Sequence, residues 1–318
     1  MREAGMSNRI LVTGASGFVG TALCNRLQAD AIDFVPVVRQ KLRSADYEIG
    51  PMTAETDWSD ALRECSCVVH LAARVHVMEE RVTNPLEAFR ALNVAATENL
   101  ARQAAQHGVR RFVFVSSIKV NGEVSSRAPF SAADVPAPAD PYGQSKLEAE
   151  LALARIAAET GLEIVIVRPP LVYGPGVKAN FLRLMQLAKR GVPLPLGAIH
   201  NRRSLVALDN LVDLLLTCTH QPAAAGQTFL VSDGHDVSTP ELIRMLASAM
   251  GKRPLLLPVP PSLLAAGANL LGKAAAADRL LGSLQLDIAP TCARLGWRPV
   301  VSIEDAIDAT VAHFLSHS

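Results

Sequence analysis

A tyrosine and a lysine lie four residues apart near the middle of the chain, at Tyr142 and Lys146. In a helix this spacing places both side chains on one face, one turn apart. The pKa of a free tyrosine is near 10, and a neighbouring ammonium lowers it by stabilising the phenolate. We therefore expect Tyr142 to act as an acid/base whose pKa Lys146 lowers. A tyrosine and a lysine on a solvated helix face would show the same spacing.

Two serines, Ser116 and Ser117, follow an apolar run at residues 112–115. Serines directly after a strand usually form a turn. Beside an acid/base pair, however, a hydroxyl can hold the substrate oxygen that changes between carbonyl and alcohol. We therefore interpret Ser117 as the third catalytic residue, an assignment that depends on Tyr142 and Lys146.

Three glycines, Gly14, Gly17 and Gly20, have the spacing G-x-x-G-x-x-G between an apolar run and an amphipathic segment. Glycine lets a backbone turn sharply and approach a pyrophosphate closely. The helix that follows presents free N–H groups to the phosphate charge. The glycines alone would also suit a tight turn without a ligand, but their place between strand and helix favours a dinucleotide site.

Arg39 ends the second apolar run, 19 positions after Gly20 (39 − 20). Many NAD enzymes have an acidic residue near this place, which accepts a bond from the ribose 2′-hydroxyl. A guanidinium suits a 2′-phosphate instead. We therefore favour NADP(H) over NAD(H), with Arg39 and Lys41 as solvated loop charges as the alternative.

Short apolar runs alternate with longer amphipathic segments through the first half of the chain. Five runs are predicted strands: residues 9–13, 34–38, 67–71, 112–116 and 164–168. Four segments between them are predicted helices: residues 19–29, 58–64, 85–107 and 142–160. This alternation predicts an α/β fold, a Rossmann-type doubly wound parallel sheet that binds ligands at the carboxyl ends of its strands.

Turn residues become frequent after Pro169, so we expect a smaller substrate-binding lobe there. Residues 205–216 and 228–231 are expected to return to the sheet, and a capped helix is expected at 239–250. The predicted nucleotide-binding domain is therefore residues 1–175 together with 201–237. The predicted lobe is residues 176–200 together with 238–318.

The 318 residues carry a net charge of +1, which gives no electrostatic reason to expect nucleic acid as a partner. The five cysteines are scattered, and Cys65-x-Cys67 has no second pair nearby. We therefore expect reduced thiols, no metal site and a cytoplasmic protein. The apolar stretch 255–286 contains Asn269 and Lys273, so we predict no membrane span there but helix packed on the core.

Together these motifs resemble the NAD(P)-dependent epimerase/dehydratase family of extended short-chain dehydrogenases. The resemblance runs along nearly the whole chain and includes the glycine loop, His70-Leu71-Ala72-Ala73, Asn93, Ser116-Ser117, Tyr142-x-x-x-Lys146 and the run 168–176. It implies Ser117, Tyr142 and Lys146 as the catalytic triad, whereas we interpret His70 as a core histidine and not as a catalyst. It implies a cofactor site formed by Gly14, Ser16, Gly17, Phe18, Val19, Glu48, Ile49, Leu71, Ala72, Ala73, Asn93, Tyr142, Lys146 and Pro169, to which Arg39 is added from its position.

The same resemblance implies that Asn180 and Phe181 contact a substrate nucleotide and that Arg203 binds its diphosphate. A helix cap and a surface charge are the plain alternatives for Asn180 and Arg203. Ser117-Ile118-Lys119-Val120-Asn121 departs from the commoner family pattern. Lys119 places a cation where a short side chain usually lies near the sugar, so we expect it to contact the substrate.

The run 116–123 resembles a subgroup from bacterial O-antigen gene clusters. The expected activity is therefore the 4-reduction of a UDP-linked 4-keto-6-deoxy-N-acetylhexosamine. The alternatives are a UDP-hexose 4-epimerase with tightly bound NAD and, outside enzymes, a dinucleotide-sensing regulator. Family resemblance also implies a homodimer through the helices at 85–107 and 142–160. Leu147 and Leu151 form an apolar stripe with Ala154 and Ala158 on the second helix, which would face the partner or, as the alternative, pack on the sheet.

Overall fold

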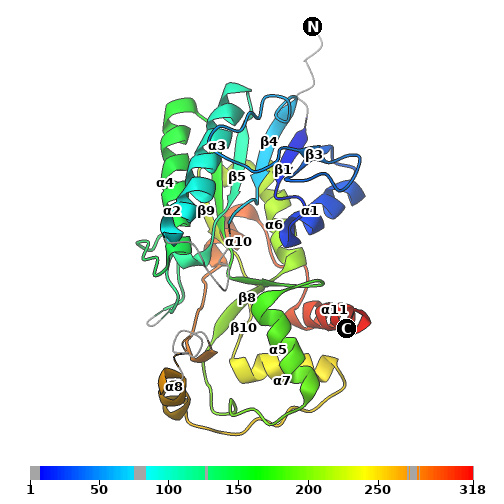
Figure 1. The fold of residues 1–318 in the computed structure, drawn as a ribbon, viewed down its shortest axis with the longest axis vertical. Helices are drawn as coiled ribbons and strands as arrows, with labels where there is room; N and C mark the ends of the chain where they lie inside the picture. Colours follow the sequence, from blue (N-terminus) through cyan, green and yellow to red (C-terminus); the bar gives the residue numbers. More distant parts are fainter. Residues whose placement is uncertain are drawn as a thin grey trace.

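The computed structural model describes residues 8–74, 84–125, 128–270, 272, 278 and 280–317. Its main sheet has seven strands in the order β3-β2-β1-β4-β5-β6-β9, and every neighbouring pair is parallel (Figure 1). The strands are β1 (Arg9–Thr13), β2 (Phe34–Val38), β3 (Tyr47–Glu48), β4 (Cys65–His70), β5 (Arg111–Val115), β6 (Glu163–Arg168) and β9 (Thr228–Leu230). The strand order reverses at β1, which confirms the Rossmann-type doubly wound fold.

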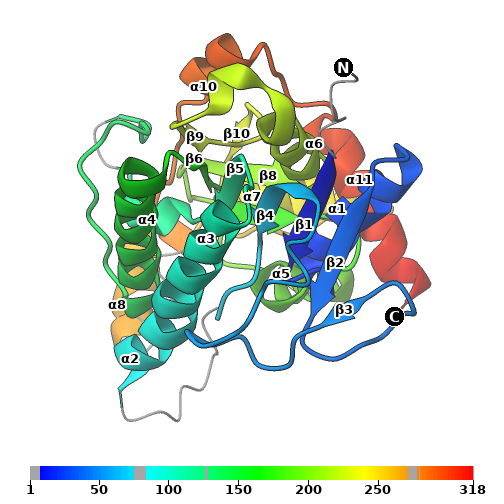
Figure 2. The same cartoon turned by 90° about the horizontal axis from the view of Figure 1, so that it is seen from above.

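Helices cover both faces of this sheet, as the view from above shows (Figure 2). On one face α1 (Phe18–Ala29) and α6 (Leu208–His220) pack on side chains such as Val12. On the other face α3 (Ala96–Gln106) and α4 (Pro141–Thr160) pack on side chains such as Leu11. Adjacent residues of β1 thus point into different cores, which explains why its sequence is apolar without alternation.

A smaller lobe lies beyond one end of the main sheet (Figure 1). Its three strands have the order β10-β8-β7, and α5, α7 and α11 surround a separate apolar cluster beside them. The bounds are β7 (Leu171–Tyr173), β8 (Arg203–Ala207), β10 (Asp236–Val237), α5 (Ala179–Arg190), α7 (Thr239–Ala249) and α11 (Ile303–Ser316). Ser238 and Glu241 form the capping box that begins α7, so the helix expected at this place is confirmed.

Three expected elements differ in the structure. Residues 58–64 form turns in place of a helix, although Trp58 in this segment is fully buried. The helix expected at 85–107 is divided into α2 (Pro85–Arg90), a π turn (Ala91–Ala95) and α3. Of the segment 205–216, the first residues belong to β8 of the small sheet and the rest to α6, which packs on the main sheet as a helix.

The apolar stretch 255–286 also differs from expectation. Its helix α8 (Pro261–Leu270) has no buried residue, and Leu263 is 64% exposed and Leu270 89%. The expectation that this segment packs on the core is therefore wrong for α8. Lys273 and Arg279 lie outside the described residues. Within the described ranges, every helix is too short or too polar to cross a membrane.

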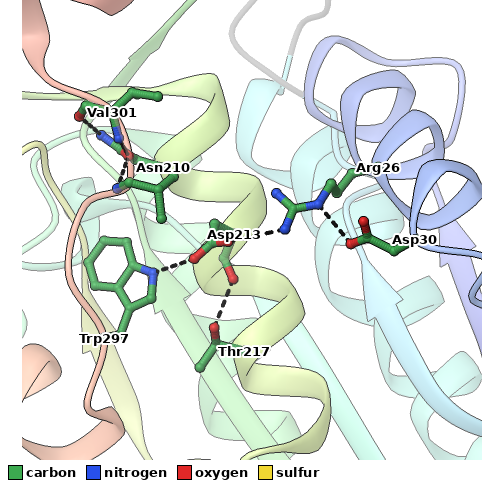
Figure 3. A network of polar contacts seen from close by, with 8 residues as sticks. Arg26, Asp30, Asn210, Asp213, Thr217, Trp297 and Val301 are labelled. Carbon is green, nitrogen blue, oxygen red and sulfur yellow. Dashed lines mark hydrogen bonds and ion pairs between the residues drawn. The ribbon is translucent and has the colours of Figure 1, made fainter.

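Polar contacts of α6 connect the C-terminal part of the chain to α1, the helix that follows the glycine loop (Figure 3). Asn210 of α6 is fully buried and accepts bonds from the backbone N–H groups of Val300 and Val301. Asp213, one turn further, accepts a bond of 2.9 Å from Trp297 Nε1 and pairs at 3.5 Å with Arg26 of α1. The α6 helix thus fixes α1 and the segment before α11 to the same face of the main sheet.

Candidate active site

The glycine loop joins β1 to α1 with very little space around its backbone. Gly14 has a φ of +66°, and a Cβ built there would lie 2.8 Å from the backbone nitrogen of Ala72. A Cβ at Gly20 would lie 2.1 Å from the carbonyl oxygen of Gly14. Gly17 caps α1 without any side-chain hydrogen bond, so the first N–H groups of the helix face outward uncovered by a side chain. Ser16 is exposed, and Phe18 and Val19 are half-buried.

A line of buried hydrogen bonds supports this loop from below. His70 bonds to Thr13 Oγ1 through Nδ1 at 2.7 Å and to Thr97 Oγ1 through Nε2 at 2.9 Å. The Thr13 hydroxyl also accepts from the backbone N–H groups of Leu71 and Ala72, each at 3.2 Å. Burial, assisted by the charge of Lys146, lowers the pKa of His70 to about 3. His70 is therefore a neutral core residue, as expected.

Asn93 lies in the π turn and is almost fully buried. Its side chain bonds twice to the backbone of Arg74, accepting at 2.8 Å and donating at 3.1 Å, and it donates at 3.0 Å to Ser145 Oγ. Asn93 therefore connects the segment after β4, which contains Leu71, Ala72 and half-buried Ala73, to α4. The π turn puts this side chain inward at a place where a regular helix would continue.

The residues expected at the adenosine end lie together beyond β2. Arg39 follows β2 and is exposed, and Glu48 belongs to β3, the neighbouring strand. Glu48 accepts a bond from the backbone of Lys41 at 3.1 Å, and Ile49 donates its N–H to Val38. A cavity of about 560 Å³ adjoins this end, lined by Ala15 and Ser16 of the glycine loop and by residues 42–46.

The three expected catalytic residues lie at the carboxyl end of β5 and on the first turns of α4. Ser117 begins the 3₁₀ turn Ile118–Val120, directly beyond β5. Lys146 is 2% exposed, and its ammonium donates at 2.8 Å to the carbonyl oxygen of Val115 and lies 4.5 Å from the Phe114 ring centre. The Tyr142 ring meets the Phe89 ring edge-on at 5.9 Å. Pro169 is buried behind the turn and accepts from Ile118 N.

The expected lowering of the Tyr142 pKa does not occur within the protein chain. Burial, and then the charge of Asp140, raises the pKa of Tyr142 to about 12. Burial also lowers the pKa of Lys146 to about 7, against the opposing influence of Glu150. The ammonium points to Val115 and Phe114, so desolvation outweighs the favourable effect that the spacing suggested.

Lys119 also differs from expectation. Its ammonium pairs with Glu123 at 2.8 Å and with Asp140, and its side chain is 27% exposed. Asp140 is the cap of α4, two residues before Tyr142. Lys119 is therefore held by two carboxylates beside the reacting residues, and a free cation directed at the sugar is not what the structure contains.

A buried charge network behind the catalytic turn was not expected from the sequence. Arg168 donates to both oxygens of Glu150, at 3.0 and 2.5 Å, and to Asn121 Oδ1 at 2.9 Å. Ser116 Oγ donates to Glu150 at 2.5 Å. Both charged residues are 5% exposed. The available signal was Glu150 itself, a carboxylate one helical turn after Lys146 on a helix face that is otherwise apolar.

The residues expected to hold the substrate lie on the smaller lobe. Asn180 is exposed in the first turn of α5, whose cap is Lys178, so Asn180 is not itself the cap. Phe181 is 1% exposed and stacks on Tyr173 at 5.2 Å, so its ring is a core side chain. Arg203 begins β8 and donates to the Gly282 carbonyl oxygen at 2.9 Å. A direct contact between the Phe181 ring and a ligand would require this stack to open.

These features fit a dinucleotide. Gly14, Gly17 and Gly20 place no side chain on the loop, which packs closely on the backbone of Ala72, and the N-terminus of α1 offers N–H groups without a competing side chain. Exposed Arg39 and Glu48 stand at the end of β2 where an adenosine ribose would lie. The residues that would hold the dinucleotide therefore lie together at the carboxyl ends of the neighbouring strands β1, β2 and β3.

Comparisons with known proteins agree with this geometry. Residues 10–232 match the NAD dependent epimerase/dehydratase family. The UDP-glucose 4-epimerase of Vibrio cholerae is 47% identical over 317 residues, which cover 98% of this chain and 96% of the relative. That of Mycolicibacterium smegmatis is 31% identical, covering 98% and 99%. The structure of MoeE5 in complex with UDP-glucose and NAD superposes with a TM-score of 0.78 and 26% identity, covering 97% and 99%.

The family match covers the main sheet, and the two epimerase relatives extend over both lobes. Both of these relatives are named as epimerases, which are enzymes. A sensor that only binds a dinucleotide is therefore no longer a competing interpretation. This chain belongs to the NAD dependent epimerase/dehydratase family and is an enzyme of the extended short-chain dehydrogenase type.

Proposed function

We propose that this enzyme is a UDP-sugar 4-epimerase, and not primarily the 4-ketoreductase that the run 116–123 suggested. The observation that carries the proposal is the 47% identity to a UDP-glucose 4-epimerase along both lobes. That similarity includes the smaller lobe, which would select the sugar nucleotide. We accordingly propose a UDP-hexose as substrate and NAD as the cofactor.

The residues of the chain divide the chemistry between them. The dinucleotide, when bound, supplies hydride transfer at C4. Tyr142 takes the proton from the C4 hydroxyl and returns it after the sugar has turned its other face. Ser117 donates a hydrogen bond to the same oxygen and holds it in place. The Lys146 ammonium, bound to Val115 O, stands one helical turn after Tyr142 and supplies the positive charge on this helix, which has to act against the burial that raises the Tyr142 pKa.

The high pKa of Tyr142 sets a condition on this mechanism. With a pKa near 12, the phenol is protonated at neutral pH in the chain alone. Positive charge near the ring is therefore needed to make it a base, and Lys146 is the nearest cation on its own helix. This requirement makes activity sensitive to every charge around the first turn of α4.

The test is to denature the purified protein and identify the released nucleotide, and separately to incubate the enzyme with UDP-glucose. Under the proposal NAD is released in near-stoichiometric amount, and UDP-galactose appears without net change at 340 nm. Net consumption of added NADPH with a 4-keto sugar, and an empty protein after purification, would contradict it. A Tyr142→Phe sample controls for a contaminating epimerase.

A second candidate remains because of Arg39, which is exposed at the end of β2 where a 2′-phosphate would be bound. On that reading the enzyme prefers NADPH and reduces a UDP-4-keto-6-deoxy-N-acetylhexosamine for O-antigen synthesis. Arg39→Asp would then shift the ratio of KM values from NADPH toward NADH. An unchanged ratio would identify Arg39 as a solvated loop charge.

We propose further that the main sheet and its helices form the nucleotide-binding domain of a cytoplasmic enzyme, and that the smaller lobe, with Asn180 and Arg203, binds the substrate. The expected division into 1–175 with 201–237 and 176–200 with 238–318 needs a correction, because β7, β8 and β10 belong to the sheet of the smaller lobe. A homodimer is proposed through α4. Leu151 on this helix is 58% exposed, and Ala154 and Ala158 are exposed as well, whereas Leu147 is half-buried. Three of the four stripe residues are therefore open to a partner. Sedimentation of the wild type against Leu151→Lys tests the dimer.

A further inference from the structure

Lys119 joins two carboxylates beside the reacting residues. Its ammonium lies 2.8 Å from Glu123 Oε1 and also pairs with Asp140 Oδ2. The three side chains are only partly exposed, at 27% for Lys119, 35% for Glu123 and 23% for Asp140. Charges sheltered in this way are screened less than charges on the open surface.

The second oxygen of Asp140 begins the catalytic helix. Asp140 Oδ1 accepts a hydrogen bond from the backbone N–H of Gly143 at 2.7 Å, which caps the N-terminus of α4. One carboxylate therefore binds Lys119 and also fixes the turn that carries Tyr142. A displacement of the Lys119 side chain would therefore shift Asp140 and, with it, the first turn of α4.

The backbone of Lys119 contacts both halves of the reacting pair. Its N–H donates to Ser117 Oγ at 3.3 Å. Its carbonyl oxygen lies so near α4 that a Cβ on Gly143 would be 2.9 Å from it. The turn with Ser117 and the helix with Tyr142 thus touch at Lys119, whose side chain closes the same contact through Asp140.

We propose that Lys119 is a positioning residue, which fixes Ser117 against the start of α4 and balances the charge of Asp140 beside Tyr142, without binding the substrate. This inference rests on the roles proposed above for Ser117 and Tyr142, whichever sugar the enzyme accepts. It explains why a lysine is compatible with a place in the family where a short side chain is commoner.

The charges around Tyr142 give the direction of the effect. Its own helix contributes Lys146 and Asp140, and Lys119 and Glu123 come from the turn after β5. On the other side Phe89 meets the ring, with Arg74 over that phenyl and an Arg90–Glu148 ion pair beside it. Loss of the Lys119 charge removes the cation that pairs with both Asp140 and Glu123, so the negative charge beside Tyr142 increases and the phenolate becomes harder to form.

The experiment compares four variants with the wild type: Lys119→Met, Lys119→Arg, Asp140→Asn and the double variant Lys119→Met/Asp140→Asn. Arg102→Met is the matched control, because Arg102 likewise joins two carboxylates, Glu98 and Glu159, at the far end of α4. For each protein, kcat and KM for UDP-glucose are measured between about pH 6 and pH 10. Circular dichroism confirms folding.

Lys119→Met is expected to lower kcat about tenfold at neutral pH, with KM nearly unchanged, because one unit of pKa changes the phenolate fraction about tenfold. The acidic limb of the kcat profile should move to higher pH. Lys119→Arg should retain most activity, and the double variant should return the limb toward the wild-type position. Asp140→Asn keeps a capping side chain and should move the limb to lower pH.

A second readout does not depend on turnover. The chain has only three tyrosines, so ¹³C labelling of the tyrosine ring gives three signals, and Tyr142→Phe identifies the relevant one. With NAD added, the Tyr142 signal should titrate at higher pH in Lys119→Met and at lower pH in Asp140→Asn. This result is decisive even if UDP-glucose proves to be the wrong substrate.

Three outcomes would overturn the proposal. A rise in KM with unchanged kcat would place Lys119 in contact with the substrate. An effect no larger than that of Arg102→Met would make it an ordinary ion pair. A Tyr142 signal that titrates identically in all variants would exclude the charge effect. If Lys119→Met does not fold, Asp140→Asn tests the same charge balance with the opposite sign.

Discussion

The cofactor half and the reaction half of the active site are held in place by different kinds of contact. The cofactor half, around Gly14 and the N-terminus of α1, is made of backbone groups that approach one another closely. The reaction half, around Ser117 and Tyr142, is made of side chains held by charges from distant segments. An added methyl group would therefore disrupt the cofactor half, whereas an unpaired charge would disrupt the reaction half.

This difference predicts how each half fails. A backbone site is damaged by added volume, because neighbouring main-chain atoms cannot move aside independently. A charge-built site is damaged when one partner is removed, because the remaining buried charge has no compensation. The predictions below test this division, beginning with the largest effect.

Tyr142→Phe removes the acid/base while keeping the ring against Phe89. Turnover should fall by about 10²–10⁴-fold, the usual loss when a positioned acid/base is removed. NAD affinity, measured by calorimetry, should stay close to that of the wild type because the glycine loop is untouched. A variant that keeps the wild-type kcat would remove Tyr142 from the mechanism.

Arg168→Met breaks the buried pair with Glu150. We expect a loss of about 3–5 kcal/mol in the free energy of unfolding, since one carboxylate remains buried without its partner. Urea unfolding provides the measurement. Arg102→Met, which removes an exposed arginine that pairs with two carboxylates, should cost no more than about 1 kcal/mol. Equal losses in the two variants would refute the importance of burial.

Gly14→Ala tests the backbone half. The φ of +66° and the contact with Ala72 should together cost about 1–3 kcal/mol of stability and weaken NAD binding. Gly161→Ala is the matched control: its φ is +78°, but nothing lies within 4 Å of its Cβ position. Its cost should therefore be strain alone, about 1–2 kcal/mol, with NAD affinity intact. Similar NAD affinities would show that close approach is unimportant.

The neutral state of His70 makes stability depend on pH. Its pKa is 6.5 as an ordinary value and about 3 in the fold, so between these pH values the unfolded chain binds a proton that the folded chain does not. Stability should therefore fall as the pH decreases from about 6.5 toward 3, by at most about 1.4 kcal/mol per pH unit from this residue. His70→Gln should show a shallower fall in urea titrations. Parallel curves for the two proteins would contradict the shift.

Elements and residues with local requirements could be predicted from the amino-acid sequence. β1 and β2 occupy the predicted residues because a strand buried on both faces needs a continuous apolar run. The turn at the loop glycines and the helix start at Ser238 could be predicted because backbone conformation and helix capping depend on residues close in the sequence. The family assignment followed from the order of such local motifs.

The environment of the reacting groups, by contrast, depends on contacts between segments that are distant in the sequence. Lys119 is bound by a carboxylate 21 positions away, and Arg168 reaches Glu150 across 18 positions, so neither pairing has a local signature. The pKa of Tyr142 is raised because the side chain is buried in the folded protein, and no spacing of residues in the sequence predicts that burial. Desolvation and ion pairing depend on what surrounds a side chain in space, and that is known only once the chain has folded.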